Sequence, residues 1–170
     1  MRLFISINFD EKTKQNILGV QSRLKRLGRG TFSRPENLHL TLAFLGEVDE
    51  SLLPKLKTVM DSVSMDPLTM EFTRIGCFRS DSELWWLGIE QNPALMELQK
   101  RLIAALRKEG FRPDTKAFKP HITLARRMHI GHADPHYLLP TAFKTRVSHM
   151  YLMLSQNSDG LLSYTQLYKK

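Results

Sequence analysis

Apolar residues along the chain switch repeatedly between a spacing of two and a spacing of three to four, which are the periods of strands and helices. Residues 2–9 alternate and predict a strand. Asp10 then offers an N-cap for a helix that should stop at Gly28 and Gly30. Residues 37–48 alternate again and predict the next strand. The pattern therefore begins as strand, helix and strand.

The rest of the chain continues in the same way. A helix is expected between Asp49 and Pro67, and another from Asn92 to Gly110, where leucines recur at helical spacing. The remaining expected elements are strands, and the last two form a hairpin that turns at residues 158–160. These strands cover residues 67–78, 83–91, 121–126, 144–157 and 161–170.

Helices and strands interleave without a low-complexity linker, which favours an α/β or α+β fold over an all-helical or all-β fold. A chain of 170 residues is long enough for one domain or two closely packed halves. We expect a single bilobal domain over residues 1–170.

The amino-acid composition indicates which kinds of molecule the protein could bind. Lys and Arg number 25 against 17 Asp and Glu, so the formal net charge is +8 and the pI is about 9.8. Such a surface attracts polyanions, of which RNA and DNA are the commonest, although it is also compatible with an ordinary basic surface. We find no run of eighteen apolar residues and no signal-peptide pattern, so we expect a cytoplasmic protein with no membrane partner. Cys77 is the only cysteine, which excludes an internal disulfide.

One short pattern occurs twice. HLTLAF begins at His39, and HITLAR begins at His121. Residues i and i+2 of a strand point the same way, so His39 shares a face with Thr41, and His121 shares one with Thr123. Two such strands lining one cleft would suit a tetrahedral phosphate, since hydroxyls bind its oxygens while one imidazole accepts a proton and the other donates one.

A single His-x-Thr in an apolar strand is more often structural, with its histidine bonded to a neighbouring carbonyl or hydroxyl. Two copies with the same flanking residues favour a paired function. Two hypotheses follow from different classes: a phosphoesterase, and an RNA-end-binding module that has lost turnover.

The sequence resembles the RNA 2',3'-cyclic phosphodiesterases, or 2'-5' RNA ligases, of the two-histidine phosphoesterase superfamily. The resemblance covers nearly the whole chain and rests on RLFISI, ENLHLTLAFLGEV, WWLGI, FKPHITLAR and a terminal Ser155, Gly160 and Tyr164. It implies a bilobal α+β fold in which two antiparallel-rich sheets line a central groove and helices pack outside. It also implies hydrolysis of a 2',3'-cyclic phosphate at an RNA end to a 2'-phosphate, without metal or cofactor, and a 2'-5' ligation in reverse.

The resemblance also assigns roles to residues. His39 would be the proton donor to the leaving 3' oxygen and His121 the proton acceptor from water, with Thr41 and Thr123 holding the phosphate. Arg126 corresponds to an arginine that is common after the second motif. Strict alternation puts Arg126 on the face opposite His121, so it reaches the site only if the strand ends, twists or carries a bulge there. The expected partner is an RNA with a cyclic phosphate end, tRNA halves among the candidates, and the expected state is a monomer.

Other signals are weaker. His129, His132 and His136 resemble a metal-ligand cluster, but Gly131 and Pro135 break any helix that would align them, so we expect no metal site. An exposed aromatic side chain could stack on the terminal base, although each candidate is better explained as core. The candidates are Phe4, Phe9, Trp85 and Trp86, and the basic residues expected to be at the rim of the groove or simply solvated are Arg34, Lys116 and Lys119.

Overall fold

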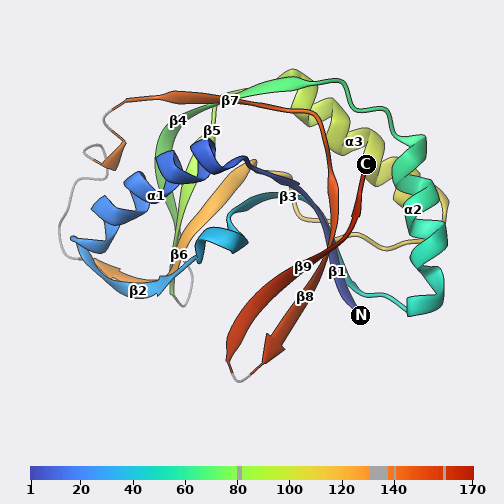
Figure 1. Cartoon of the computed structure of the whole chain (residues 1–170), viewed down its shortest axis with the longest axis horizontal. Coiled ribbons are helices and arrows are strands. Elements are labelled where there is room, and N and C mark those ends of the chain that lie inside the picture. Colours follow the sequence, from blue (N-terminus) through green and yellow to red (C-terminus); the bar gives the residue numbers. More distant parts are fainter. Residues whose placement is uncertain (80–81, 131–137, 140, 159) are drawn as a thin grey trace.

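The computed structural model describes residues 1–79, 82–130, 138–139, 141–158 and 160–170. Within these ranges the strands form two antiparallel sheets (Figure 1). The first sheet has the order β3 (His39–Glu47), β1 (Arg2–Asn8), β8 (Tyr151–Ser158) and β9 (Leu161–Lys169). The second sheet has the order β2 (Gly28–Phe32), β6 (His121–Ile130), β5 (Glu83–Ile89), β4 (Leu68–Arg79) and β7 (Phe143–Val147).

The helices divide between the two sheets. Helix α1 (Glu11–Lys25) contacts β2 and β7 of the second sheet, whereas α3 (Pro93–Lys108) contacts β3 of the first and α2 (Leu53–Ser62) packs on α3. Figure 1 shows α1 at one end of the molecule and the α2–α3 pair at the other. Short 3-10 turns, η1 (Pro35–Asn37) and η2 (Glu50–Leu52), precede β3 and α2. The expected bilobal α+β architecture is therefore confirmed.

The two lobes meet where β3 and β6 contact each other, so the two motif strands lie at the junction of the sheets. Strand β1, the neighbour of β3, is buried on both faces: Leu3 and Ile5 are completely buried, and so is Ser6. Burying a leucine or isoleucine side chain stabilises a fold by about 1.5–3 kcal/mol. Strand β1, which pairs with the strand of the first motif, is thus anchored in the core.

The expected helix stop at Gly28 and Gly30 has a different explanation. Helix α1 already ends at Lys25, and the glycines belong to β2, a strand that the sequence pattern did not predict. A Cβ atom on Gly28 would lie 2.0 Å from the carbonyl oxygen of His129, and one on Gly30 would lie 2.8 Å from Met128 Sδ. These glycines therefore allow β2 to approach β6 closely, which a periodicity argument cannot show.

The expected strand over residues 144–157 is wrong as one element. The chain forms β7, leaves the second sheet after Val147, and enters the first sheet as β8 at Tyr151. Both parts alternate, so the hydrophobic pattern does not mark the crossing between sheets. The hairpin of β8 and β9 is confirmed, and it extends beyond the rest of the first sheet (Figure 1).

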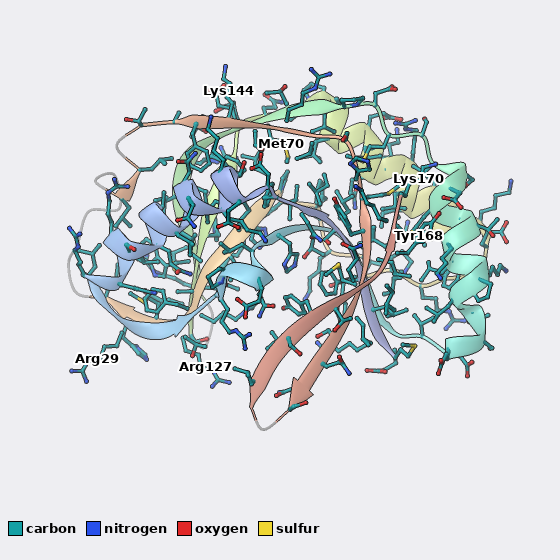
Figure 2. The ribbon with its side chains drawn as sticks, viewed as in Figure 1. Arg29, Met70, Arg127, Lys144, Tyr168 and Lys170 are labelled. Atoms are coloured by element: carbon teal, nitrogen blue, oxygen red, sulfur yellow. The ribbon has the colours of Figure 1, made fainter. Side chains whose placement is uncertain are left out.

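The end of the chain is tied to α2. Tyr168 Oη donates to Asp61 Oδ1 at 2.7 Å, and Lys170 Nζ donates to the Asp61 carbonyl at 2.6 Å. Figure 2 shows both side chains beside this helix. In the ranges that the structure describes, no helix combines the length and apolar character required to cross a membrane.

Candidate active site

A pocket of about 710 Å³ receives side chains from both motif strands. Strand β3 contributes His39, Thr41 and Phe44, and β6 contributes His121, Thr123 and Arg126. The five residues expected to form a site are thus brought together in one cavity, although they come from opposite lobes. Both histidines therefore line a single cavity.

Each histidine is oriented by the backbone in the same way. His39 Nδ1 lies 2.7 Å from the Asn37 carbonyl oxygen, and His121 Nδ1 lies 2.6 Å from the Lys119 carbonyl oxygen. A carbonyl oxygen only accepts, so Nδ1 carries the proton in both rings. Nε2 of each neutral imidazole is then an acceptor, available for proton exchange.

The threonine two residues after His39 completes this arrangement. Thr41 Oγ1 lies 3.0 Å from His39 Nε2, and with the ring neutral the hydroxyl is the donor. Because a hydroxyl also has two lone pairs, Thr41 can accept from Nε2 once that nitrogen is protonated and donate to an anion instead. Thr123 lines the same pocket from β6.

Matched bulges change the direction of the side chains that follow the two threonines. In β3, Ser6 of β1 pairs with Thr41 and Ile5 pairs with Ala43, so Leu42 is an additional residue. In β6, Trp86 of β5 pairs with Thr123 and Trp85 pairs with Ala125, so Leu124 is additional at the equivalent position. Each strand thus buries two successive residues before it turns again toward the pocket.

The β6 bulge resolves the question of Arg126. Strict alternation predicted the opposite face, but the additional residue returns Arg126 to the side of His121, where it lines the pocket. For the same reason Phe44 lies on the pocket side of β3. Ala43, which strict alternation would place on the same face as His39 and Thr41, is buried instead. Arg127 adds a second irregularity with φ of 50°, uncommon for a residue other than glycine.

Aromatic rings enclose the first histidine. The ring centroids of Phe4 and Tyr164 lie 4.8 and 5.1 Å from that of His39. The pKa of His39 is lowered to about 4, mainly by burial. The charges of Arg126 and His121 also lower it, whereas the hydrogen bond to Asn37 opposes the shift. His39 is neutral in the free protein at pH 7.

The second histidine has a similar but separate aromatic wall. The ring centroids of Phe78 and Trp86 lie 5.2 and 6.4 Å from that of His121. Burial also lowers the pKa of His121, with a smaller contribution from the charge of Arg126. Trp86 in turn lies on Gly76 and Gly88, where a Cβ atom would come within 2.2 and 2.7 Å of its ring. Of the aromatic residues considered for stacking on a terminal base, Phe9 and Trp85 are buried in the core.

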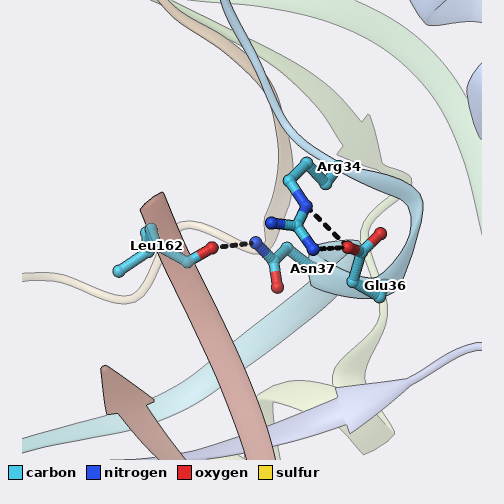
Figure 3. Close-up of polar contacts among 4 residues, drawn as sticks. All are labelled: Arg34, Glu36, Asn37 and Leu162. Atoms are coloured by element: carbon cyan, nitrogen blue, oxygen red, sulfur yellow. Dashed lines mark hydrogen bonds and ion pairs between the residues drawn. The ribbon is translucent and has the colours of Figure 1, made fainter. Parts of the chain in front are cut away.

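Positive side chains line the pocket, but they differ in their partners. Arg34 is paired with Glu36, beside the contact of Asn37 Nδ2 with the Leu162 carbonyl (Figure 3). Lys116 lies 3.8 Å from Asp114. Lys119 does not line the pocket, and its Nζ lies 5.8 Å from the centroid of Phe78.

The two arginines left in the pocket lining are Arg2 and Arg126, and among the described residues neither forms an ion pair. Arg2 lies over the ring of Phe44 at 5.1 Å. Arg29 and Arg127 project outward from the β2–β6 edge (Figure 2). The cations free to meet an anion in the cavity are therefore Arg2 and Arg126.

Sequence reasoning missed Arg2 as a pocket residue and considered Tyr164 only as part of a terminal pattern. The alternation of residues 2–9 carried no sign that Arg2 would face a cavity, because the partner strand arrives from elsewhere in the chain. Of the histidines once considered as metal ligands, His132 and His136 lie outside the described residues. The described part of the chain contains no group of three His, Cys, Asp or Glu side chains arranged to hold a metal ion.

The model of the 2'-5' RNA ligase superfamily matches residues 14–159. The chain belongs to this superfamily. A relative from Archaeoglobus fulgidus, named RNA 2',3'-cyclic phosphodiesterase, is 32% identical over 128 residues, which are 74% of this chain and 72% of that protein. A relative of the same name from Thermotoga maritima is 35% identical over 131 residues, 74% of this chain and 70% of that protein.

Solved structures agree with this membership of the 2'-5' RNA ligase superfamily. The crystal structure of Escherichia coli LigT complexed with 3'-AMP has a TM-score of 0.82 and 27% sequence identity. The match covers 99% of this chain and 96% of that one. The family resemblance inferred from the two motifs is therefore confirmed, and the likeness extends over both lobes.

Proposed function

We propose that this protein hydrolyses the 2',3'-cyclic phosphate at an RNA end and leaves a 2'-phosphomonoester. The observation that carries the proposal is the pair of imidazoles on opposite lobes, each with Nδ1 bound to a backbone carbonyl and each lining one pocket. The names of the relatives support the substrate. The net charge of +8 suits an RNA partner.

In this mechanism His121 Nε2 takes a proton from water while the water oxygen attacks phosphorus. The bond from phosphorus to the 3' oxygen breaks, and protonated His39 gives its Nε2 proton to that oxygen. Atoms balance: water adds across one phosphorus–oxygen bond, and one proton moves from His39 to product as another moves to His121. A positioned acid or base contributes about 10² to 10⁴ in rate.

The phosphate itself prepares His39 for this role. A low pKa in the free protein leaves the ring neutral, but a bound phosphodiester brings a negative charge that favours the imidazolium. Thr41 and Thr123 then donate to phosphate oxygens, which leaves the Nε2 proton of His39 free to reach the 3' oxygen. Arg126 binds the same anion through charge-assisted hydrogen bonds.

The same two proton-transfer groups serve the reverse reaction, in which a 5'-hydroxyl end replaces water and a 2'-5' linkage forms. In this proposal the chain acts as a monomer in the cytoplasm and needs no metal or cofactor. The physiological substrate in this proposal is an RNA with a cyclic phosphate end, and tRNA halves are among the candidates.

The test uses an oligonucleotide that ends in a 2',3'-cyclic phosphate, incubated with protein and a metal chelator. We expect a mass gain of one water and a 2'-phosphate end, with turnover lost in both His39→Ala and His121→Ala. His149→Ala is the matched control, since His149 bonds to Ser148 rather than lining the pocket. Binding without conversion would favour the RNA-end-binding module, and loss of turnover with chelator would indicate a metal-dependent phosphoesterase.

A further inference from the structure

The bulge that directs Arg126 toward the pocket is bound from behind by a buried amide. Gln21 lies on α1 with 2% of its surface exposed. Its Nε2 atom donates to the Leu124 carbonyl at 3.0 Å and to the Ser33 carbonyl at 2.7 Å. Leu124 is the additional residue of the β6 bulge, so this side chain contacts the irregularity itself.

Ser33 completes the attachment of the bulge. Its backbone N–H donates to the Leu124 carbonyl at 2.9 Å, and its Oγ donates to the Thr123 carbonyl at 2.7 Å. The carbonyl groups of Thr123 and Leu124 at the bulge thus accept hydrogen bonds from α1 and from the segment after β2. An unpaired buried carbonyl is costly, so these bonds favour the bulged conformation over a regular strand.

A buried glutamine on the apolar face of a helix is unusual, and its hydrogen bonds to the β6 bulge explain why it is there. Gln21 lies between Ile17, Val20 and Leu24, all of them buried. Burying an amide without hydrogen bonds is unfavourable, whereas both N–H groups of this one have acceptors. Its position is therefore explained by its contact with β6 better than by packing.

The first lobe also has a glutamine that donates to the additional residue of its bulge. Gln99 on α3 donates through Nε2 to the Leu42 carbonyl at 3.3 Å, and Leu42 is the additional residue of the β3 bulge. That bulge directs Phe44 into the pocket, where the second lobe has Arg126. The two glutamines thus support bulges of the same shape, of which only one presents a charge.

We propose that Gln21 is a positioning residue for anion binding: it holds the β6 bulge so that the Arg126 guanidinium faces the pocket. The inference rests on the proposed function for its meaning in catalysis. Gln21 contacts no substrate in this scheme and acts through Arg126. Gln99 supports a bulge without a charge and has no equivalent effect on anions.

The experiment compares Gln21→Met with Gln99→Met, since methionine fills a similar volume without donating. Binding of inorganic phosphate is measured by calorimetry, and kcat and KM are measured on the cyclic-phosphate oligonucleotide. We expect Gln21→Met to weaken phosphate binding and raise KM about 5- to 10-fold, while kcat changes less. This is less than the loss of a charge-assisted hydrogen bond, because Arg126 is still present but less well directed. Gln99→Met should change phosphate affinity less than about 2-fold, within the range of a neutral contact outside the anion site.

A double-mutant cycle separates positioning from general stability. In an Arg126→Ala background, Gln21→Met should have no further effect on phosphate affinity, because the group that it positions is gone. Equal losses in the two methionine variants, or an additive effect in the Arg126→Ala background, would overturn the proposal.

A second variant keeps the test decisive if Gln21→Met does not fold. Ser33→Ala removes the hydroxyl that donates to the Thr123 carbonyl, although Ser33 also lines the pocket. It should give a smaller loss with the same dependence on Arg126, and additivity with Arg126→Ala would again contradict the proposal. Phosphate binding is independent of turnover, so absence of cyclic-phosphate hydrolysis in the unaltered protein would refute the proposed function and leave this inference testable.

Discussion

Strands β3 and β6 share a motif, a bulge and a backbone-bound histidine, yet they end the shared pattern with different residues. Phe44 stands in β3 where Arg126 stands in β6. His39 is packed between Phe4 and Tyr164, and burial lowers its pKa more strongly than that of His121. The difference shows how a nearly symmetric scaffold places two histidines in unlike surroundings and directs only one charged side chain into the pocket.

The two arginines of the pocket extend this comparison. The charge of Arg126 lowers the pKa values of both histidines and opposes the burial that raises the pKa of Tyr164. Arg2, above the ring of Phe44, opposes that rise in Tyr164 alone. The charge of Arg126 therefore affects both imidazoles and Tyr164, whereas that of Arg2 affects Tyr164.

The largest effect on activity is expected when one imidazole is removed at a time. His39→Ala and His121→Ala should each lower kcat on the cyclic-phosphate end by about 10² to 10⁴. A nitrophenyl ester of a nucleoside phosphate, whose leaving group needs no proton, should recover much of the loss in His39→Ala and little in His121→Ala. Equal recovery in both variants would show that the donor and acceptor roles are not divided as proposed.

The next test concerns the residues that end the two motifs. Arg126→Gln should weaken phosphate binding about 10- to 150-fold, because a hydrogen bond to a charged group contributes about 1.5–3 kcal/mol. Phe44→Leu, at the matched position in β3, should change it less than about 3-fold. Titration calorimetry with inorganic phosphate measures both, and comparable losses would mean that the two positions are functionally alike.

The third test uses pH. The proposed mechanism needs one protonated and one neutral histidine. Activity should therefore fall below the lower pKa of the pair, where no acceptor remains, and above the higher one, where no donor remains. Both pKa values are lowered from 6.5 in the free protein, so kcat/KM should peak below pH 6.5 and decline through pH 7.

Bound phosphate raises both pKa values, so the profile of kcat should lie at higher pH than that of kcat/KM. Circular dichroism at each pH controls for unfolding. A kcat/KM that rises from pH 6 to pH 8 would contradict the lowered pKa values of the pair.

The smallest expected effect belongs to Arg2. Arg2→Gln should leave kcat unchanged and reduce the slope of log KM against log salt by about 0.7, the value for one phosphate contact on a single strand. Arg29→Gln, which removes an arginine that points away from the pocket, is the matched control (Figure 2). If both variants alter the slope equally, Arg2 contributes only to the general charge of the protein.

Much of the fold could be predicted because its signals are local. Asp10 and Asn92 cap α1 and α3 as their positions suggested, and Gly160 turns the terminal hairpin with φ of 79°. Strand β2 escaped prediction, since its glycines are explained by contact with β6, which is distant in sequence.

The candidate site divides in the same way. The repeated His-x-Thr indicated the reacting pair because residues i and i+2 of any strand share a face, and this needs no knowledge of the partner strand. Arg126 could not be placed on that ground, since its direction depends on one additional residue in β6.

That bulge is bound by Gln21, 103 residues before Leu124. The repeated motif, the net charge and the N-caps of α1 and α3 thus follow from residues close together in the sequence, because the period of a strand or helix is a property of the backbone. The direction of Arg126, the convergence of the two histidines and the enclosure that lowers the pKa of His39 follow from packing between distant segments, because a bulge or a buried ring is stabilised only by the groups that surround it in space.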